Sequence, residues 1–328
     1  MAHAAAAAFL GYELTEVASR TAERAAHVAD AFGARATTYD RLPNGADVVV
    51  VATPPQCHAT DAVRMLDAGV CVLLEKPLCR TLDEADRIVA AAAAHNGRLL
   101  YGENLAYAPV IQTMVAMADR VGTPTHLEVR ALQGLPNWGA FTTDEWGGGA
   151  LFDLGVHPLA VSMLLANAAG LGRVVAVSAT LSGGPGHGSD EHAKVRLHFG
   201  SGFGATVISS WQAGPEPLWD AQLAGEQGVL RAEIFPKPML EFNGDPVALP
   251  VATSPMVGLE DLGYAAQLRA LVEDSMAGRE PAMSAAFGRE VLQVVLAGYS
   301  SAGNDGARIA LPFTGARDRT PLELWRGE

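Results

Sequence analysis

Two apolar runs decide the fold, and both lie in residues 47–77, DVVVVATPPQCHATDAVRMLDAGVCVLLEKP. The first run covers residues 47–52 and the second residues 70–74, so each has about the length of one strand. Continuous apolar runs of this length are typical of strands buried on both faces of a parallel sheet. The segment between them, residues 56–67, has a helical pattern that is stopped by Gly69. We therefore expect a strand–helix–strand unit with a right-handed crossover.

The same alternation continues on both sides of this unit. Strands are predicted over residues 13–18 and 98–102, and helices over residues 21–32 and 81–95. Residues 1–10 have the composition of an alanine-rich helix, with no basic flank or cleavage site of a signal peptide. Residues 1–104 are thus predicted to form an α/β domain with a doubly wound parallel sheet.

The pattern changes after Pro109, and we assign residues 105–328 to a second, α+β domain. A helix is predicted up to about residue 120, a helix near residues 149–169, and two closing helices over about 259–277 and 284–301. Antiparallel strands separated by Gly, Pro and Ser turns are predicted from residue 126 onward, notably over 174–181, 193–199, 204–211 and 222–224.

Charge and composition exclude several partners. The net charge is −13 and no cluster of lysine or arginine is present, which argues against nucleic acid and anionic membranes. The apolar runs are far shorter than the roughly 20 residues of a membrane span. The three cysteines show neither metal-ligand spacing nor a pairing pattern, which favours free thiols in a reducing cytoplasm and no metal site.

Glu75, Lys76 and Pro77 directly follow the second buried strand. Ligands bind at the carboxyl ends of the strands in an open parallel sheet, so this charged pair is expected to face a cleft. Burial can lower the pKa of a lysine there and let it act as an acid or a base. Taken alone, the three residues are equally compatible with a surface turn.

Two further segments add weight to this tripeptide. Residues 53–58, TPPQCH, follow the preceding strand, and residues 147–157, GGGALFDLGVH, combine a glycine run with Asp153 and His157 four positions apart. This ordered set resembles the Gfo/Idh/MocA family, named for glucose–fructose oxidoreductase, inositol dehydrogenase and a rhizopine-catabolism protein. The resemblance covers almost the whole chain, down to IALP at residues 309–312.

The resemblance implies a Rossmann-type domain that holds NAD or NADP, and a second domain with a large, mostly antiparallel open sheet. In the family that sheet often mediates oligomerisation, so a homodimer or homotetramer is expected. The active site is implied to lie between the domains, with a sugar, cyclitol or related polyol as substrate. Catalytic and substrate-binding roles carry over to Lys76, Asp153 and His157. On a continuous helix Asp153 would stand beside His157 and favour its protonated form, although the two could also form a purely structural pair.

Other residues are candidates for the cofactor and substrate. The cofactor is expected near Thr53, Pro54, Glu75 and Lys76. His58 is a further cofactor candidate, and a capping or packing role is an equal alternative for it.

Asn104 and Tyr107 match a segment that lines the cleft in the family. Asn104 is a candidate for the cofactor. Tyr107 is a candidate for the substrate, and a structural role is an equal alternative for it. Ser19 and Arg20 lie at the end of a predicted strand, where an acidic residue would bind the ribose hydroxyls and favour NAD. Serine and arginine at these positions favour NADP instead. The alternative is that Arg20 is only a solvated surface charge. Trp138, Asp144 and Trp146 precede the glycine run and are weaker substrate candidates.

The beginning of the chain departs from the family pattern. The family's first strand and its G-x-G-x-x-G turn should precede the first helix, whereas Met1-Ala2-His3-Ala4 looks like the inside of that helix. Either the start codon is assigned too far downstream, which we favour because Lys76, Asp153 and His157 are retained, or the chain is a truncation with a damaged cofactor site. Translating the upstream DNA in frame distinguishes the two.

The leading functional hypothesis is an NAD(P)-dependent oxidoreductase that transfers a hydride between the nicotinamide and a hydroxyl or keto group of a sugar or polyol. The first alternative is a non-catalytic regulatory homologue that binds cofactor or sugar. The second is an NAD-dependent glycosidase, for which no residue speaks specifically.

Overall fold

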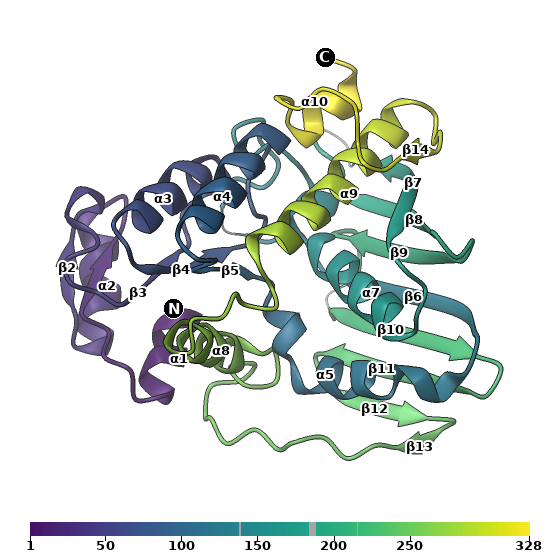
Figure 1. The fold of residues 1–328 in the computed structure, drawn as a ribbon, viewed down its shortest axis with the longest axis horizontal. Helices are drawn as coiled ribbons and strands as arrows, with labels where there is room; N and C mark the ends of the chain where they lie inside the picture. The colour runs from purple at the N-terminus through teal and green to yellow at the C-terminus, as the bar shows by residue number, and fades with distance from the viewer. Residues whose placement is uncertain (138, 184–187, 215) are drawn as a thin grey trace.

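The computed structural model describes residues 1–137, 139–183, 188–214 and 216–328. These residues form two sheet-containing parts that lie side by side, as Figure 1 shows. The first part holds the parallel strands of the N-terminal third of the chain, and the second part holds one large sheet. A domain boundary after residue 104 stays a prediction. Two helices from the end of the chain, α8 (Tyr264–Met276) and α9 (Ala285–Gly303), contribute side chains to the cores of the first part.

A three-stranded parallel sheet forms the centre of the first part. Its strands, in order, are β3 (Val48–Val51), β4 (Cys71–Glu75) and β5 (Leu99–Gly102). Val72 and Leu74 belong to the core on the side of α3 (Pro55–Asp67) and α4 (Leu82–Ala94). Cys71 and Leu73 belong to the core on the side of α1 (Ala2–Phe9) and α8. The predicted burial on both faces is confirmed for β4, whereas in β3 Val49 and Val51 are buried and Val48 and Val50 are only half-buried.

The helices of the first part begin and end where their sequence signals lie. α2 (Ala22–Phe32) is capped by Thr21, whose side chain accepts from the backbone N–H of Arg24, and ends at Gly33 with a φ of 67°. Thr81 and Glu84 form a reciprocal capping box at the start of α4. Residues 2–9 are helical, as the alanine-rich composition predicted.

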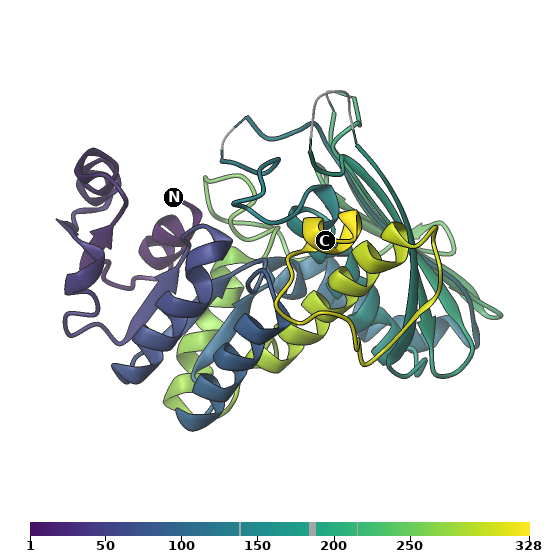
Figure 2. The ribbon, with the colours of Figure 1, turned by 90° about the horizontal axis from the view of Figure 1, so that it is seen from above.

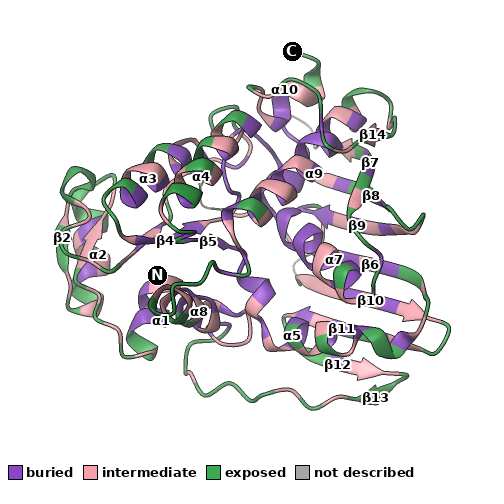
Figure 3. Cartoon of the chain, in the orientation of Figure 1, coloured by how far each residue is buried: buried purple, intermediate pink, exposed green. Residues whose placement is uncertain are grey.

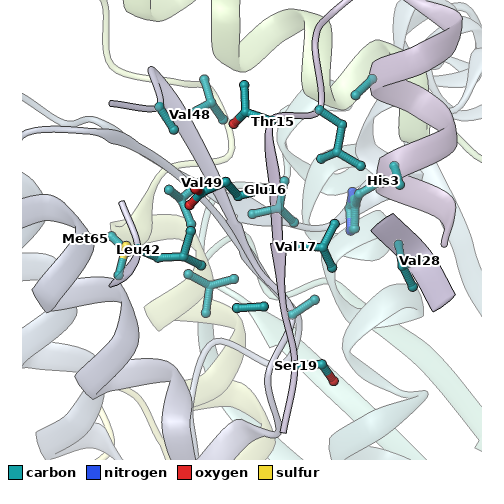
Figure 4. A pocket seen from close by; sticks show the side chains of 18 of the residues that line it. His3, Thr15, Glu16, Val17, Ser19, Val28, Leu42, Val48, Val49 and Met65 are labelled. Atoms are coloured by element: carbon teal, nitrogen blue, oxygen red, sulfur yellow. The ribbon is translucent and has the colours of Figure 1, made fainter. Parts of the chain in front are cut away.

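A gap separates two groups of strands in the first part. β1 (Glu16–Ala18) pairs in parallel with β2 (Arg35–Thr37), and within the described residues neither strand is bonded to β3. A cavity of about 1080 Å³ lies between the two groups, and both β1 and β3 line it along their length. Figure 4 shows Val17 and Val49 among the side chains around it. Within the described residues the two groups of strands are therefore not joined into one sheet.

The second part is built on one nine-stranded sheet. β6 (Pro124–Leu132) pairs in parallel with β9 (Gly204–Ser210), and the other neighbouring strands pair antiparallel. The sheet is therefore mostly antiparallel, as expected. The strand order is β13 (Asp245–Pro246), β12 (Met239–Phe242), β11 (Gly228–Phe235), β10 (Leu218–Gly225), β6, β9, β8 (His192–Phe199), β7 (Val174–Ser182) and β14 (Ile309–Ala310).

Helices cover one face of this sheet, the face turned toward the first part. Figures 1 and 2 show α5 (Pro109–Ala116), α7 (Val156–Ala168) and α9 on that side, with the short α10 (Pro321–Arg326) near the C-terminus. α7 is buried over most of its length, as Figure 3 shows. On β8 the side chains alternate, so that Val195 is buried whereas Lys194 and Arg196 are exposed. The expected homodimer or homotetramer stays a prediction.

Some elements differ from the sequence expectation. The helix predicted near residues 149–169 is broken into α6 (Ala150–Asp153) and α7. At the break, a Cβ on Gly155 would lie 2.5 Å from the backbone oxygen of Leu151, so the close approach requires glycine. The strand predicted over residues 13–18 is shorter, and β2, β11, β12 and β13 were not predicted. None of the helices in the described segments is long and apolar enough to cross a membrane.

Candidate active site

Lys76 leaves the carboxyl end of β4 and its side chain ends on Asp153 of α6. Lys76 Nζ donates to Oδ1 of Asp153 at 2.9 Å and to the backbone oxygen of the same residue at 2.9 Å. The side chains are 19% and 8% exposed, so the ion pair is largely withdrawn from water. The structure thus brings together the charged tripeptide and the glycine-run segment, which are 77 positions apart in the chain.

The electrostatics of Lys76 differ from the expectation. Burial lowers the pKa of the ammonium, but the charge and hydrogen bond of Asp153, with further charge from Glu75 and Glu103, outweigh burial and raise the pKa above its usual value. The expectation of a lysine whose pKa is lowered by burial is wrong for this arrangement. Lys76 therefore stays a cation near neutral pH and acts as a charged hydrogen-bond donor.

Asp190 anchors the glycine run that precedes Asp153. Its backbone oxygen accepts from the N–H of Ala150 at 2.9 Å, and its Oδ2 accepts from the N–H of Leu151 at 2.8 Å. The hydroxyl of Tyr299 donates to Oδ1, and the N–H of Gly149 donates to that hydroxyl at 2.9 Å. Sequence reasoning missed Asp190 and Tyr299, because both are distant in the chain and carry no motif.

His157, at the start of α7, is paired with a carboxylate that the sequence did not single out. Its Nδ1 lies 2.8 Å from Oε1 and 3.0 Å from Oε2 of Glu103. The expected partner, Asp153, binds Lys76 instead, because the break between α6 and α7 removes the continuous helix that would place residues four apart on one face. Glu103 follows β5 directly, so the argument applied to Lys76, a charge at the carboxyl end of a buried strand, would have found it.

Glu75 connects this site to α1. His3 Nε2 lies 2.6 Å from Oε1 of Glu75, and Oε2 of Glu75 accepts from the N–H of Lys76 at 2.9 Å. Burial raises the pKa of Glu75, but the hydrogen bond and charge of His3 and the charge of Lys76 outweigh it, so the pKa is lower than usual. His3 also lines the cavity between β1 and β3, whereas Lys76 and His157 are not among its lining residues. The cavity therefore approaches the Lys76 site through His3 and Glu75.

Asn104 and Tyr107 lie on the short 3₁₀ helix Asn104–Tyr107, and their side chains contact residues outside the Lys76 site. The side-chain amide of Asn104 donates to the backbone oxygen of Leu262 at 2.7 Å. Tyr107 packs against the cluster that includes Leu268 and Met283, and burial raises the pKa of its hydroxyl. These contacts are structural ones that tie the segment to the region of α8.

Two cofactor candidates line the cavity at the carboxyl ends of β1 and β3. They are Ser19 and Thr53, and the hydroxyl of Thr53 donates to Oδ2 of Asp61 at 2.9 Å. Ser19 is labelled beside the cavity in Figure 4. Arg20 is exposed and is not among the lining residues, although the neighbouring Arg24 is.

His58 and Pro54 shape the loop between β3 and α3. Pro54 is the N-cap residue of α3. His58 is buried, with Nδ1 2.9 Å from the backbone oxygen of Pro77 and Nε2 2.7 Å from that of Thr53. Burial lowers the pKa of His58, and the hydrogen bonds to these carbonyls partly oppose the effect. With both ring nitrogens on backbone carbonyls, His58 fixes the Thr53 and Pro77 loops relative to each other.

The aromatic and acidic candidates before the glycine run have separate surroundings. Trp138 lies outside the described residues. Asp144 binds Arg326 at 2.7 Å, and this hydrogen bond to the guanidinium lowers its pKa. Trp146 packs on Phe141 with ring centroids 4.8 Å apart.

Comparison with known proteins places the chain in a family. The model described as the oxidoreductase family, NAD-binding Rossmann fold, matches residues 1–103, and the model of the GFO/IDH/MocA C-terminal domain matches residues 111–231. Together they cover the sheets and helices that carry Lys76, Asp153 and His157. The fold and the two matches define a two-part protein with a Rossmann fold of the NAD-binding class. The chain belongs to the Gfo/Idh/MocA family.

Individual relatives show the breadth of this family. The chain is 34% identical over 137 residues to a putative UDP-kanosamine synthase oxidoreductase subunit of Amycolatopsis mediterranei, a match that covers 40% of this chain and 38% of the relative. It is 26% identical to the NADP⁺-dependent D-xylose 1-dehydrogenase of Haloarcula marismortui, over 67% of this chain and 65% of that protein. The chain thus spans less than two thirds of either relative. The chain is also similar to the crystal structure of GenD2 from gentamicin A biosynthesis, in complex with NAD, with a TM-score of 0.83 and 25% sequence identity. The match covers 94% of this chain and 92% of the GenD2 chain.

Proposed function

We propose that the chain is an NAD(P)-dependent oxidoreductase that interconverts a hydroxyl and a keto group on a sugar, cyclitol or related polyol. The observation that carries the proposal is a set of two buried contacts, the ion pair of Lys76 with Asp153 and the hydrogen-bonded pair of His157 with Glu103. Both stand where the carboxyl ends of β4 and β5 meet α6 and α7. Relatives that act on D-xylose and on UDP-sugars support the substrate class.

Lys76 and His157 have different tasks in this proposal. Because its pKa is raised, Lys76 remains charged and donates a hydrogen bond to the oxygen of the substrate. His157 takes the hydroxyl proton, since an imidazole is the usual base for this task near neutral pH. Asp153 holds the ammonium of Lys76 in place through Oδ1 and its backbone oxygen. A nicotinamide cofactor held near Ser19 and Thr53 would supply the hydride acceptor for this oxidation.

The carboxyl ends of β1 and β3 are a fitting place for the cofactor, because nucleotides bind at such ends in doubly wound sheets. Ser19 and Thr53 stand at these two ends and line the nearby part of the cavity. We assign the ribose and phosphate contacts to these residues. NADP is favoured over NAD because Ser19 is followed by the exposed Arg20 rather than by an acid.

A non-catalytic sugar- or cofactor-binding protein is the second candidate. It is favoured by the lining of the cavity, because neither Lys76 nor His157 is among the residues around it. The buried pairs of Lys76 with Asp153 and of His157 with Glu103 argue for the enzyme, since binding alone does not require a charged donor and a base at one place.

Calorimetry followed by a turnover assay tests the proposal. Titration with NADP and NAD measures binding, and absorbance at 340 nm with a panel of aldoses, cyclitols and UDP-sugars measures reduction of the cofactor. The proposal predicts binding and turnover with at least one member of the panel. Binding of cofactor or sugar without any turnover would support the regulatory alternative and overturn the enzyme.

A further inference from the structure

Glu103 is a fully buried carboxylate directly behind His157. Its exposed fraction is 0%, and both of its oxygens lie within hydrogen-bond distance of Nδ1 of His157. Oε1 also accepts from the backbone N–H of Leu105 at 3.1 Å. Burying a carboxylate is costly unless it is paired and hydrogen-bonded, and His157 is its only side-chain ion partner among the described residues.

The position of Glu103 is held from a second side. Gln267 of α8 is itself fully buried. With its amide oxygen turned toward the 3₁₀ segment, it accepts from the backbone N–H of Glu103 at 3.3 Å and of Asn104 at 3.2 Å. The backbone of Glu103 is therefore hydrogen-bonded to α8, and this bond helps to keep the carboxylate next to His157.

The geometry determines which nitrogen of His157 carries the proton. A carboxylate only accepts hydrogen bonds, so Nδ1 of His157 must be the donor in this contact. In the neutral ring Nε2 is then the atom with the free lone pair. No residue of the described segments hydrogen-bonds to Nε2. Trp219 of β10 packs on the imidazole with ring centroids 5.4 Å apart and planes tilted by 31°, which restrains the plane of the ring.

We propose that Glu103 is a positioning residue that fixes His157 as the Nδ1–H tautomer, so that Nε2 exchanges the proton with the substrate hydroxyl. This inference rests on the proposed function. In the oxidation direction the O–H bond of the substrate breaks and an N–H bond forms at Nε2, while the carbon gives its hydride to the nicotinamide and becomes a carbonyl carbon. The imidazolium that results keeps its Nδ1–H on the negative charge of Glu103, which stabilises the charge formed in this step.

Two substitutions separate positioning from mere packing. Glu103→Gln keeps an oxygen that accepts from Nδ1 and from Leu105 but removes the negative charge, whereas Glu103→Met fills similar space and removes the acceptor as well. Glu290→Gln, at the ion pair with Arg173 near the surface, is the control. The readouts are the ¹⁵N resonances of the His157 ring, kcat and KM for the sugar, and the Kd of the cofactor.

The expected result has three parts. In the unsubstituted protein and in Glu103→Gln, Nδ1 of His157 carries the proton in the neutral ring, and in Glu103→Met the preference for that tautomer is lost. kcat falls at least about tenfold in both variants because charge support or orientation of the base is lost, while the cofactor Kd and the control are unchanged. A neutral His157 protonated on Nε2 in the unsubstituted protein, or kcat retained in folded Glu103→Met, would overturn the inference. Absence of turnover in the unsubstituted protein would instead contradict the proposed function, and the ¹⁵N resonances would still decide the tautomer.

Discussion

Lys76 Nζ lies 2.9 Å from Oδ1 of Asp153, so the charged residue at the end of β4 is bonded to the last residue of α6. This pair joins the two parts of the molecule at one point. It also separates Asp153 from His157, whose partner is Glu103. The four groups therefore form two neighbouring pairs, Lys76 with Asp153 and His157 with Glu103, rather than the expected pair of Asp153 with His157.

The Lys76–Asp153 pair predicts a stability pattern. Lys76→Met leaves a buried carboxylate without its cation, so we expect the free energy of unfolding to fall by about 3 kcal/mol. In Lys76→Met with Asp153→Asn, the buried charge is gone and part of the loss should be recovered. Denaturant unfolding of the three proteins measures the difference. Equal stability of the single and double variants would show that Asp153 does not depend on the ammonium.

The buried carboxyl of Asp190 predicts a pH dependence of stability. Burial raises its pKa to about 6, and its hydrogen bonds only partly oppose this effect. Because the folded state then binds the proton more tightly than the unfolded state, stability is fully present below the ordinary pKa of 3.8 and is lost as the pH rises through about 6. Each unit of pKa difference is worth about 1.4 kcal/mol, so the contribution of this group is about 3 kcal/mol.

Asp190→Asn tests this pH dependence. The asparagine cannot ionise, so the free energy of unfolding of the variant should not show the loss that ionisation of Asp190 causes between pH 4 and pH 7. We expect the difference between the two proteins to change by up to about 3 kcal/mol across this range. Denaturant unfolding at several pH values gives the comparison, and parallel profiles for the two proteins would refute the assignment.

Gly149 predicts a sharp sensitivity in the anchor of α6. A Cβ at this position would overlap the backbone and carboxylate oxygens of Asp190, so Gly149→Ala must displace the segment that leads to Asp153. We expect loss of turnover and of about 1–3 kcal/mol of stability, as is usual for overpacking. Gly134→Ala is the matched control, because nothing lies within 4 Å of its added Cβ. Thermal melts and turnover that are the same for both variants would contradict the role of the anchor.

Arg20 predicts a change in cofactor preference. If its guanidinium holds a 2′-phosphate, Arg20→Ala should raise the Kd of NADP by about tenfold or more and leave that of NAD nearly unchanged, because only NADP loses a charge-assisted hydrogen bond. Arg173→Ala, which removes the surface partner of Glu290 in the second part of the molecule, serves as control. Calorimetry measures both constants. An equal change in the Kd of NAD and of NADP would show that Arg20 does not bind the 2′-phosphate.

Much of the fold was predictable from the sequence, for physical reasons. The run of β4 is apolar because helices cover both faces of the strand, and such a run is typical of a buried strand. The end strands β12 and β13 escaped prediction because they are short and partly exposed, so they carry no clear alternation.

The site was predictable in its members but not in its pairing. Lys76 and Asp153 are brought together as the motifs suggested. The Asp153–His157 pair failed because the rule for residues four apart assumes one continuous helix, and the break at Gly155 ends it. Asp190 reaches the site through tertiary contacts that no spacing along the chain records. Glu103 could have been found from its place directly after β5, although its contact with His157 could not.

The central claim is that a charged Lys76 and a basic His157 carry out hydride-coupled proton transfer. The most direct test compares turnover at saturating cofactor for the unsubstituted protein, Lys76→Met and His157→Asn, with cofactor Kd measured in parallel. We predict a fall in kcat of at least about a hundredfold in each variant, the lower range for a general acid or base, with little change in Kd. Turnover that persists in either variant, at an unchanged Kd, would contradict the account.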